Sequence, residues 1–268
     1  RYMRVLMCPP DYFDVTYEIN TWMHTTVKPD KLKACRQWQS LYDMLRDDLG
    51  AVVEIVAPQP GLPDMVFTAN AGLVWGKTLI PSRFRFAERQ GEVAHFVEWF
   101  VNNSFTIRTL PEDTPGSFEG EGDVLLYGDI LLAGYRQRSD AAAYKALAGI
   151  LCKEVLPLEL ADTRWYHLDT CLFPLRPGLL AYYPPAFDEY AQRVLSELPG
   201  EKIILSEHDA LRFGGNAVVI GEKIAMNSGC HQLAADLQAH GFTTFPTDLS
   251  EFLKSGGAAK CLTLLLEH

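Results

Sequence analysis

The stretch Gly122–Tyr135, GDVLLYGDILLAGY, contains two apolar runs on either side of Gly128-Asp129. A two-residue turn with glycine between apolar runs is typical of a β-hairpin. The same pattern occurs three more times, as NAGLVWGKTLIPS from Asn70, LDTCLFPLRPGLLAYY from Leu168 and GNAVVIGEKIAMNS from Gly215. A pattern that returns at intervals of roughly 20–50 residues indicates a fold built from repeats.

Helical patterns and short strands separate these hairpins. Apolar residues recur at helical spacing in five segments: Asp30–Leu49, Arg85–Val101, Ser139–Val155, Ala186–Leu198 and Cys230–His240. Short apolar stretches that predict strands follow most of them: VVEIVAP, SFTIRTLP, KIILS and TTFPT. Each repeat is therefore expected to contain a hairpin, a helix and a strand.

A fifth repeat starts with KCLTLLL at Lys260, just before the sequence ends. The opening stretch YMRVLMCPP has the apolar pattern of a strand and would supply the missing second strand. This pairing would close the repeats into a ring. No Ser/Gly-rich linker or charge block marks a boundary, so we expect residues 1–268 to form one closed α/β domain.

Composition disfavours several classes of protein. The chain has 268 residues, 48% of them hydrophobic, and a formal net charge of −10, which disfavours nucleic acid as a partner. No uninterrupted apolar run reaches the roughly 18 residues of a membrane helix, so no membrane partner is expected. The six cysteines are spread singly without a C-x-x-C pair, which favours a reducing, cytoplasmic location.

Five polar residues occupy corresponding places in the repeats. Aligning the hairpins puts them at the same first-strand position: Asn70, Asp123, Asp169, Asn216 and Cys261. Short polar residues often begin strands at turns, which is the ordinary explanation for any one of them. In a closed ring, however, equivalent positions face the same axis. Five in register, one of them a cysteine, favour convergence on a central cavity.

Cys261 is the candidate nucleophile. It follows Gly256-Gly257 in SGGAAKC, where glycines permit a tight turn and close backbone approach. A nucleophilic thiol needs a nearby base or cation and a group that moves protons. His167 in WYHLDT is the candidate for this role, and in a strand it would share a face with Asp169. The alternative is a core role, since lone cysteines are usually small buried hydrophobes.

The run FEGEGD places Glu119, Glu121 and Asp123 between glycines. It is either an acidic turn before a strand or a group of carboxylates that orient the histidine or a ligand. The histidines do not recur at zinc-ligand spacing, and the chain has no G-x-S-x-G, G-x-G-x-x-G or Walker sequence. We therefore expect neither a metal site nor a cofactor.

Together these features resemble the guanidino-group-modifying superfamily, which includes arginine deiminase, dimethylarginine dimethylaminohydrolase and the amidinotransferases. The resemblance covers essentially the whole chain and rests on five segments: Leu62–Val74 (LPDMVFTANAGLV), FEGEGD, Gly134–Asp140 (GYRQRSD), His167–Thr170 (HLDT) and Gly256–Cys261 (GGAAKC). It implies the pentein fold, a five-bladed pseudo-symmetric α/β propeller with its site at the centre.

The resemblance also implies roles for individual residues. Cys261 is similar to the family's nucleophile and His167 to its general acid and base. Substrate-binding positions are expected at Asp169 and Asp64 for the guanidinium, Arg138 for the α-carboxylate with Arg89 as helper, Asn20 in a lid loop, Asn216 with the adjacent Ala217, and the acidic run Glu119, Glu121 and Asp123. FEGEGD is one residue longer than the family's E-G-G-D form, so the resemblance does not choose among these three acids.

Asn70 departs from the family pattern, because deiminases usually carry an acidic residue at this position. An amide offers both a donor and an acceptor, so it suits a neutral ureido group as well as a guanidinium. This favours an arginine dihydrolase, which converts L-arginine to L-ornithine, two ammonia and CO2. The alternatives are a deiminase stopping at citrulline, a hydrolase of succinylarginine or dimethylarginine, and a non-catalytic arginine-binding or regulatory module.

The dihydrolase resemblance implies partners as well. L-arginine is the expected substrate, and a fused C-terminal ornithine-processing domain and a homo-oligomer are expected in the complete protein. The sequence starts at Arg1, and its last residues, Leu266-Glu267-His268, resemble the remnant of an expression tag. We therefore expect this chain to be a piece of a longer polypeptide.

Overall fold

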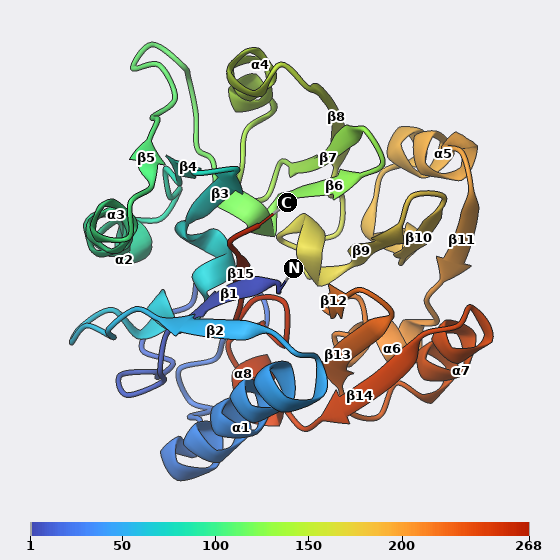
Figure 1. Ribbon diagram of the computed structural model, residues 1–268, viewed down its shortest axis with the longest axis horizontal. Helices are drawn as coiled ribbons and strands as arrows, with labels where there is room; N and C mark the ends of the chain where they lie inside the picture. The colour runs from blue at the N-terminus through green and yellow to red at the C-terminus, as the bar shows by residue number, and fades with distance from the viewer. Residues whose placement is uncertain (1, 268) are drawn as a thin grey trace.

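The computed structural model describes residues 2–267 and contains five three-stranded sheets arranged in a ring (Figure 1). Each sheet combines an antiparallel pair with a third strand parallel to its central strand. The sheets are β15-β1-β2 (Leu264–Leu265, Arg4–Met7, Val52–Ile55), β3-β4-β5 (Gly72–Trp75, Thr78–Pro81, Thr106–Ile107), β6-β7-β8 (Val124–Tyr127, Ile130–Tyr135, Glu154–Glu159), β9-β10-β11 (Leu172–Arg176, Leu179–Tyr182, Glu201–Ile204) and β12-β13-β14 (Val218–Ile220, Lys223–Asn227, Thr243–Thr247). The predicted five-bladed α/β propeller is confirmed.

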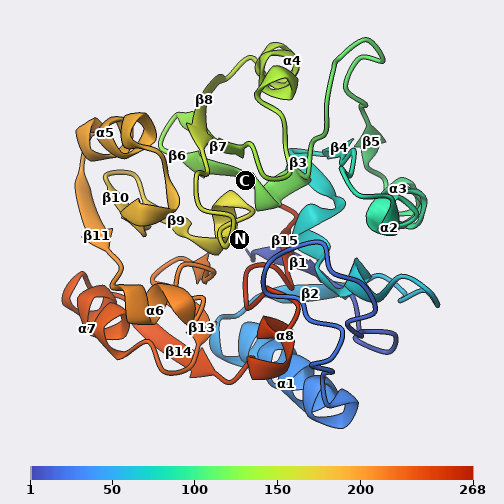
Figure 2. The same ribbon diagram turned by 180° about the vertical axis from the view of Figure 1, so that it is seen from behind.

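The ring closes through β1 and β15. Val5 pairs with Leu265 and Leu6 with Leu264 in antiparallel register, while β1 also pairs parallel with β2. The opening strand therefore completes the fifth sheet, as the sequence predicts. The strands β1 and β15 lie near the centre of the ring (Figures 1 and 2).

Tight turns connect the two strands of the four predicted hairpins. Each turn contains a glycine with positive φ, namely Gly76, Gly128, Gly178 and Gly221, with values from +59° to +83°. Glycine adopts this backbone conformation without the steric cost that a Cβ imposes. The hairpins are therefore fixed locally by the sequence.

The chain also forms helices, and the longer ones lie toward the outside of the ring (Figure 2). The helices are α1 (Lys31–Asp43, continued by a π-helical turn Met44–Asp48), α2 (Ala87–Gln90), α3 (Glu92–Asn102), α4 (Ala141–Leu151), α5 (Glu189–Glu197), α6 (Glu207–Leu211), α7 (His231–Ala239) and α8 (Ser250–Leu253). The sequence predicts helices in all five segments that contain α1 to α5 and α7, and it misses the short α6 and α8.

Two predicted helices differ from the structure. The helix expected over Arg85–Val101 is interrupted at Gly91, which separates α2 from α3. The helix expected over Ser139–Val155 ends at Leu151, because Cys152 adopts a left-handed conformation with φ of +50°. Residues Glu154–Glu159 then form β8, so the predicted helix wrongly includes the first two residues of this strand.

The aligned polar residues do not lie in the first strands, contrary to the prediction, but in turns directly before them. Asn70 belongs to the 3₁₀ turn Thr68–Ala71 and Asp169 to the 3₁₀ turn Leu168–Thr170. Since side chains do not alternate between two faces in a 3₁₀ turn, the expectation that His167 and Asp169 share a strand face is wrong. The two side chains instead contact different partners.

Buried apolar side chains pack between neighbouring sheets. One cluster joins Leu6 of β1, Val74 of β3 and Leu264 of β15. Leu266 is buried as well, and its N–H donates to the carbonyl of Arg4, whereas His268 of the expected tag remnant lies outside the described residues. No helix within residues 2–267 has the length and apolar character needed to cross a membrane.

Candidate active site

A narrow cavity lies where turns from several repeats meet. Its lining residues are Ile19, Asn20, Asp64, Phe67, Asn70, Arg89, Arg138, Tyr166, Ser255 and Cys261, six of them predicted site residues. Its volume of about 10 Å³ corresponds to roughly one water molecule. An amino-acid ligand therefore requires a lining segment to move, and Ile19-Asn20 belongs to the loop before α1.

Asn216 holds the turn that carries Cys261. Its Oδ1 accepts hydrogen bonds from the backbone N–H groups of Ala258 (3.1 Å) and Cys261 (3.2 Å). Its Nδ2 donates to the carbonyl of Asp169 (2.9 Å) and lies 3.2 Å from Cys261 Sγ. One buried amide thus connects the turn that carries Cys261 to the turn that carries Asp169.

The Cys261 thiol is buried beside a carboxylate. Sγ lies 3.9 Å from Asp169 Oδ1, and Asp169 Oδ2 has no hydrogen-bond partner in the described part of the chain. Burial, followed by the Asp169 charge, raises the pKa of Cys261 well above its usual range. Burial also raises the pKa of Asp169 to about 7, against the opposing charge of Lys260. A cationic donor placed here would stabilise the ionised forms of both Cys261 and Asp169.

His167 contacts Glu119 rather than Asp169. The Nε2 atom lies 2.8 Å from Glu119 Oε1, and Nδ1 has no partner among the described residues. Burial lowers the pKa of His167 to about 4, although Glu119 opposes this shift. At neutral pH the imidazole is therefore neutral. If Nε2–H donates to the carboxylate, Nδ1 is left as the acceptor.

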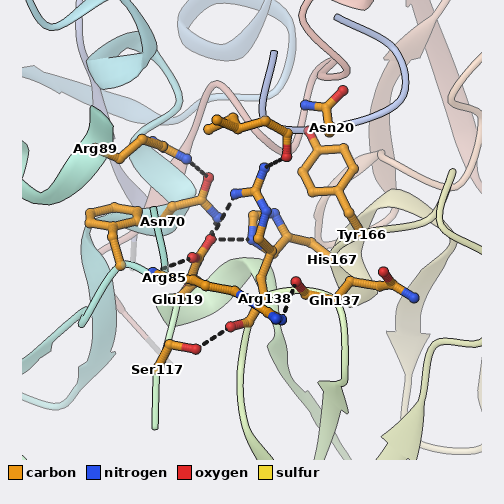
Figure 3. Close-up of polar contacts among 12 residues, drawn as sticks. Asn20, Asn70, Arg85, Arg89, Ser117, Glu119, Gln137, Arg138, Tyr166 and His167 are labelled. Atoms are coloured by element: carbon orange, nitrogen blue, oxygen red, sulfur yellow. Dashed lines mark hydrogen bonds and ion pairs between the residues drawn. The ribbon is translucent and has the colours of Figure 1, made fainter. Parts of the chain in front are cut away.

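Glu119 is the acid of FEGEGD that joins the site (Figure 3). Its Oε1 also accepts from Arg138 Nη1 at 3.0 Å, and its Oε2 accepts from the backbone N–H of Arg85 at 3.0 Å. Burial would raise the pKa of Glu119, but the Arg138 charge and the His167 contact outweigh it and hold the carboxyl ionised. Glu119 therefore orients His167.

The other two acids of this run have different partners. Glu121 forms an ion pair with Lys260 Nζ at 2.8 Å. Asp123 accepts from Ser139 Oγ (2.6 Å) and from the N–H of Leu168 (3.0 Å). Neither acid lines the narrow cavity, and the same is true of the other predicted residues Glu119, His167, Asp169, Asn216 and Ala217.

Asn70 is oriented by Arg89. Arg89 Nη1 donates to Asn70 Oδ1 at 2.7 Å, while its Nε and Nη2 contact both oxygens of Glu92 at 2.9 and 3.0 Å. Its Nδ2 donates one N–H to the Glu119 carbonyl at 3.5 Å, which leaves the second N–H of the amide for a ligand. A Cβ on Gly122 would stand 2.2 Å from this Nδ2, so only glycine leaves room for it.

Arg138 is held from several sides (Figure 3). Its guanidinium lies between the rings of Phe86 and Tyr166, at 4.9 and 4.8 Å from their centroids. Its Nη2 donates to the carbonyl of Ile19 at 2.8 Å. Glu119 accepts one further N–H of this guanidinium. Because a guanidinium has five N–H donors, Arg138 retains N–H groups for an anionic ligand.

Polar contacts hold the loop before α1 at the cavity. The Tyr17 hydroxyl donates to Asp64 Oδ2 (2.5 Å), and Ser255 Oγ donates to Asp64 Oδ1 (3.2 Å). Asn20 Nδ2 donates to the Ser255 carbonyl at 3.1 Å. Asp64 and Asn20, both predicted, are thus brought together by two residues that the sequence analysis missed.

The residues missed by the sequence analysis are mostly partners of predicted ones: Tyr17, Arg85, Glu92, Tyr166, Ser255 and Lys260. Two of them carried a local signal. Glu92 follows Arg89 at the three-residue spacing of helical ion pairs, and Lys260 adjoins Cys261.

No protein-family model matches the chain. It is 48% identical over 267 residues to the bifunctional arginine dihydrolase/ornithine cyclodeaminase AgrE of Nostoc sp., covering 98% of this chain and only 37% of the relative. It is 42% identical over 265 residues to the N(G),N(G)-dimethylarginine dimethylaminohydrolase of Mycobacterium tuberculosis, covering 98% and 86%. It superposes with a TM-score of 0.94 and 46% identity on the N-terminal domain of ArgZ, a cyanobacterial arginine dihydrolase bound to product, covering 99% and 98% of the two chains.

Proposed function

Because the chain belongs to the guanidino-group-modifying superfamily, we propose that it is an arginine dihydrolase, which hydrolyses L-arginine to L-ornithine, two ammonia and CO2. The carrying observation is the orientation of Asn70, whose Oδ1 accepts from Arg89 and whose Nδ2 donates one N–H to the Glu119 carbonyl and keeps the other for the ligand. A donor at this point suits the carbonyl oxygen of a ureido group. The similarity to AgrE and to the ArgZ domain supports the same reaction.

The first step forms a covalent bond to sulfur. The substrate guanidinium lies beside Asp169, whose Oδ2 is free to accept from it. The Cys261 proton passes to neutral His167 as Sγ attacks the guanidinium carbon. His167 then returns this proton to a terminal amino group, which leaves as ammonia. The product is a thiouronium on Cys261.

Water resolves this intermediate. His167, neutral again, takes a proton from the water whose oxygen adds to the thiouronium carbon. The C–S bond breaks as the hydroxyl of this adduct loses its proton to solvent, the thiolate leaves, and citrulline remains in the cavity, while His167 keeps the proton that it took from water. In this proposal Arg138 and Asn70, which both line the cavity, hold its α-carboxylate and its ureido oxygen.

A second round converts citrulline to ornithine. Sγ attacks the ureido carbon, a second ammonia leaves with the proton from His167, and a thiocarbamate forms. Water cleaves it to a carbamate, which loses CO2 to give ornithine. A deiminase would instead release citrulline, so retention of the neutral intermediate decides between these two activities.

Product analysis tests the proposal. Purified chain incubated with L-arginine under reducing conditions should release ornithine and two ammonia per arginine. Accumulation of citrulline without ornithine would make it a deiminase. The M. tuberculosis relative favours a second candidate, dimethylarginine hydrolysis, which dimethylarginine offered in parallel would reveal through dimethylamine release. Arginine binding without turnover would indicate a non-catalytic module.

Several properties of the whole protein are part of this proposal. A fused ornithine-processing domain is proposed because AgrE combines both activities in a chain of which this one spans 37%. A single catalytic domain over residues 1–268 and a homo-oligomer are proposed as well. A reducing, cytoplasmic location is supported by the cysteines, all of which are free in the structure.

A further inference from the structure

Lys260, the residue before Cys261, forms a buried ion pair with Glu121. Lys260 Nζ is 2.8 Å from Glu121 Oε1, and their side chains are 7% and 1% exposed. Lys260 directly precedes Cys261 in the chain and does not line the narrow cavity. With Glu121 it lines a separate, mainly apolar cavity of about 210 Å³, whose walls include Val124, Leu172 and Val218.

Burying a charge pair costs desolvation free energy that its Coulombic attraction does not always offset. Because Lys260 adjoins Cys261 in the chain, this pair places a positive and a negative charge near the sulfur. The charged and titratable side chains around Cys261 are Asp169, whose Oδ1 lies 3.9 Å from Sγ, its chain neighbour Lys260, and those that line the same cavity, namely Asp64, Arg89, Arg138 and Tyr166. Arg89 pairs with Glu92 and Arg138 with Glu119, whereas Lys260 is the cation next to Cys261 in the chain and lines the separate cavity with Glu121.

We propose that Lys260 is a positioning residue for the proposed reaction, because it supplies the positive charge that favours the Cys261 thiolate. Without Lys260, a Cys261 thiolate would form near the carboxylates of Asp169 and Glu121, and the lysine that now pairs with Glu121 would not offset their charges. The thiolate, Asp169 and Glu121 carry three negative charges, so Lys260 leaves a net charge of −2 for the substrate guanidinium to offset, against −3 without the lysine. Glu121 moderates the Lys260 charge, so the two residues act on the thiol in opposite directions.

The test reads the thiol directly. The rate at which iodoacetamide alkylates Cys261 is measured against pH, by mass spectrometry of the Cys261 peptide, without arginine. Only the thiolate reacts, so the pH midpoint reports the acidity of the thiol. The exposed cysteines, Cys35 and Cys152, serve as internal standards in the same sample.

Opposite shifts are expected for the two partners. Lys260→Met should raise the midpoint by on the order of one pH unit, and Glu121→Gln should lower it. The double variant Lys260→Met/Glu121→Gln should fall between them. Lys254→Met is the matched control, because Lys254 forms a 2.8 Å pair with Glu251 in the α8 region and lies at the partly exposed surface.

A purely structural role predicts a different result. Both variants would then lose thermal stability without moving the midpoint, or would move it in the same direction, and either result overturns the proposal. If Lys260→Met does not fold, Glu121→Gln decides alone, since an unchanged or raised midpoint contradicts the role. Because no arginine is used, a chain that makes no ornithine leaves this test intact, and a failed test leaves product analysis intact.

Discussion

At the scale of single residues, the two proposed reacting groups, Cys261 and His167, are buried in their uncharged forms. Burial raises the pKa of the Cys261 thiol and lowers that of His167 to about 4, so sulfur keeps its proton and the imidazole is neutral at neutral pH. Transfer of the proton from sulfur to His167 creates two buried charges. It therefore becomes favourable when the guanidinium adds a positive charge beside the sulfur.

Replacing the nucleophile should separate binding from chemistry. Cys261→Ser is expected to abolish turnover while arginine binding is largely retained, because Sγ contributes mainly to bond formation. The measurements are ammonia release and calorimetric titration with arginine. Retention of more than about a hundredth of the wild-type kcat, a loss below ~3 kcal/mol, would exclude the covalent route. Cys171→Ser, at a buried cysteine whose thiol contacts the Leu168 carbonyl, is the control for an internal Cys→Ser change.

Asn70→Asp should divide the two hydrolyses. A carboxylate still pairs with the guanidinium, so the first hydrolysis should survive. The ureido oxygen of citrulline, however, would meet an acceptor where the Nδ2 donor now stands, at a cost on the order of 1.5–3 kcal/mol. We expect citrulline to leak out while ornithine falls, measured as the citrulline-to-ornithine ratio. An unchanged ratio in an active variant would remove the main support for the dihydrolase.

At the scale of elements, the turn before β15 depends on one amide. Asn216→Ala would leave the N–H groups of Ala258 and Cys261 and the carbonyl of Asp169 without this partner. Unsatisfied buried groups should lower the free energy of unfolding by about 2–4 kcal/mol and slow turnover, because the nucleophile turn loosens. Urea denaturation and ammonia release measure the two effects. Asn102→Ala, at the exposed end of α3, should change stability by less than ~0.5 kcal/mol. Equal effects at both positions would show that Asn216 does not hold the turn.

At the scale of the whole molecule, the β1–β15 pair joins the two ends of the described chain. Leu6 is fully buried in β1 opposite Leu264, three residues after Cys261. Leu6→Ala should lower the free energy of unfolding by about 2–5 kcal/mol and reduce activity as well, because the sheet that anchors the nucleophile turn is weakened. Leu32→Ala, at a 74% exposed position of α1, is the matched control. Loss of stability with full activity would mean that the nucleophile turn is independent of ring closure.

The repeated architecture follows from the sequence because its signals are local. Apolar runs around Gly76, Gly128 and Gly221 specify hairpins through the backbone of a few adjacent residues. Their repetition indicates the ring, and the aligned polar positions indicate where it converges. The resemblance supplied the proposal that Cys261 and His167 are the reacting groups.

The tertiary structure decided how the polar groups pair. Glu119, Glu121 and Asp123 alternate with glycines, and the 3₁₀ turn with Gly120 at φ of +64° directs them to His167, to Lys260 and to Ser139, respectively. No spacing rule predicts this, because each partner comes from a distant segment of the chain. The same holds for Asn70, because Arg89 of α2, itself paired with Glu92 of α3, orients its amide. Local backbone preferences fix the repeats, whereas the partners of buried charges depend on contacts that exist only after the ring has closed.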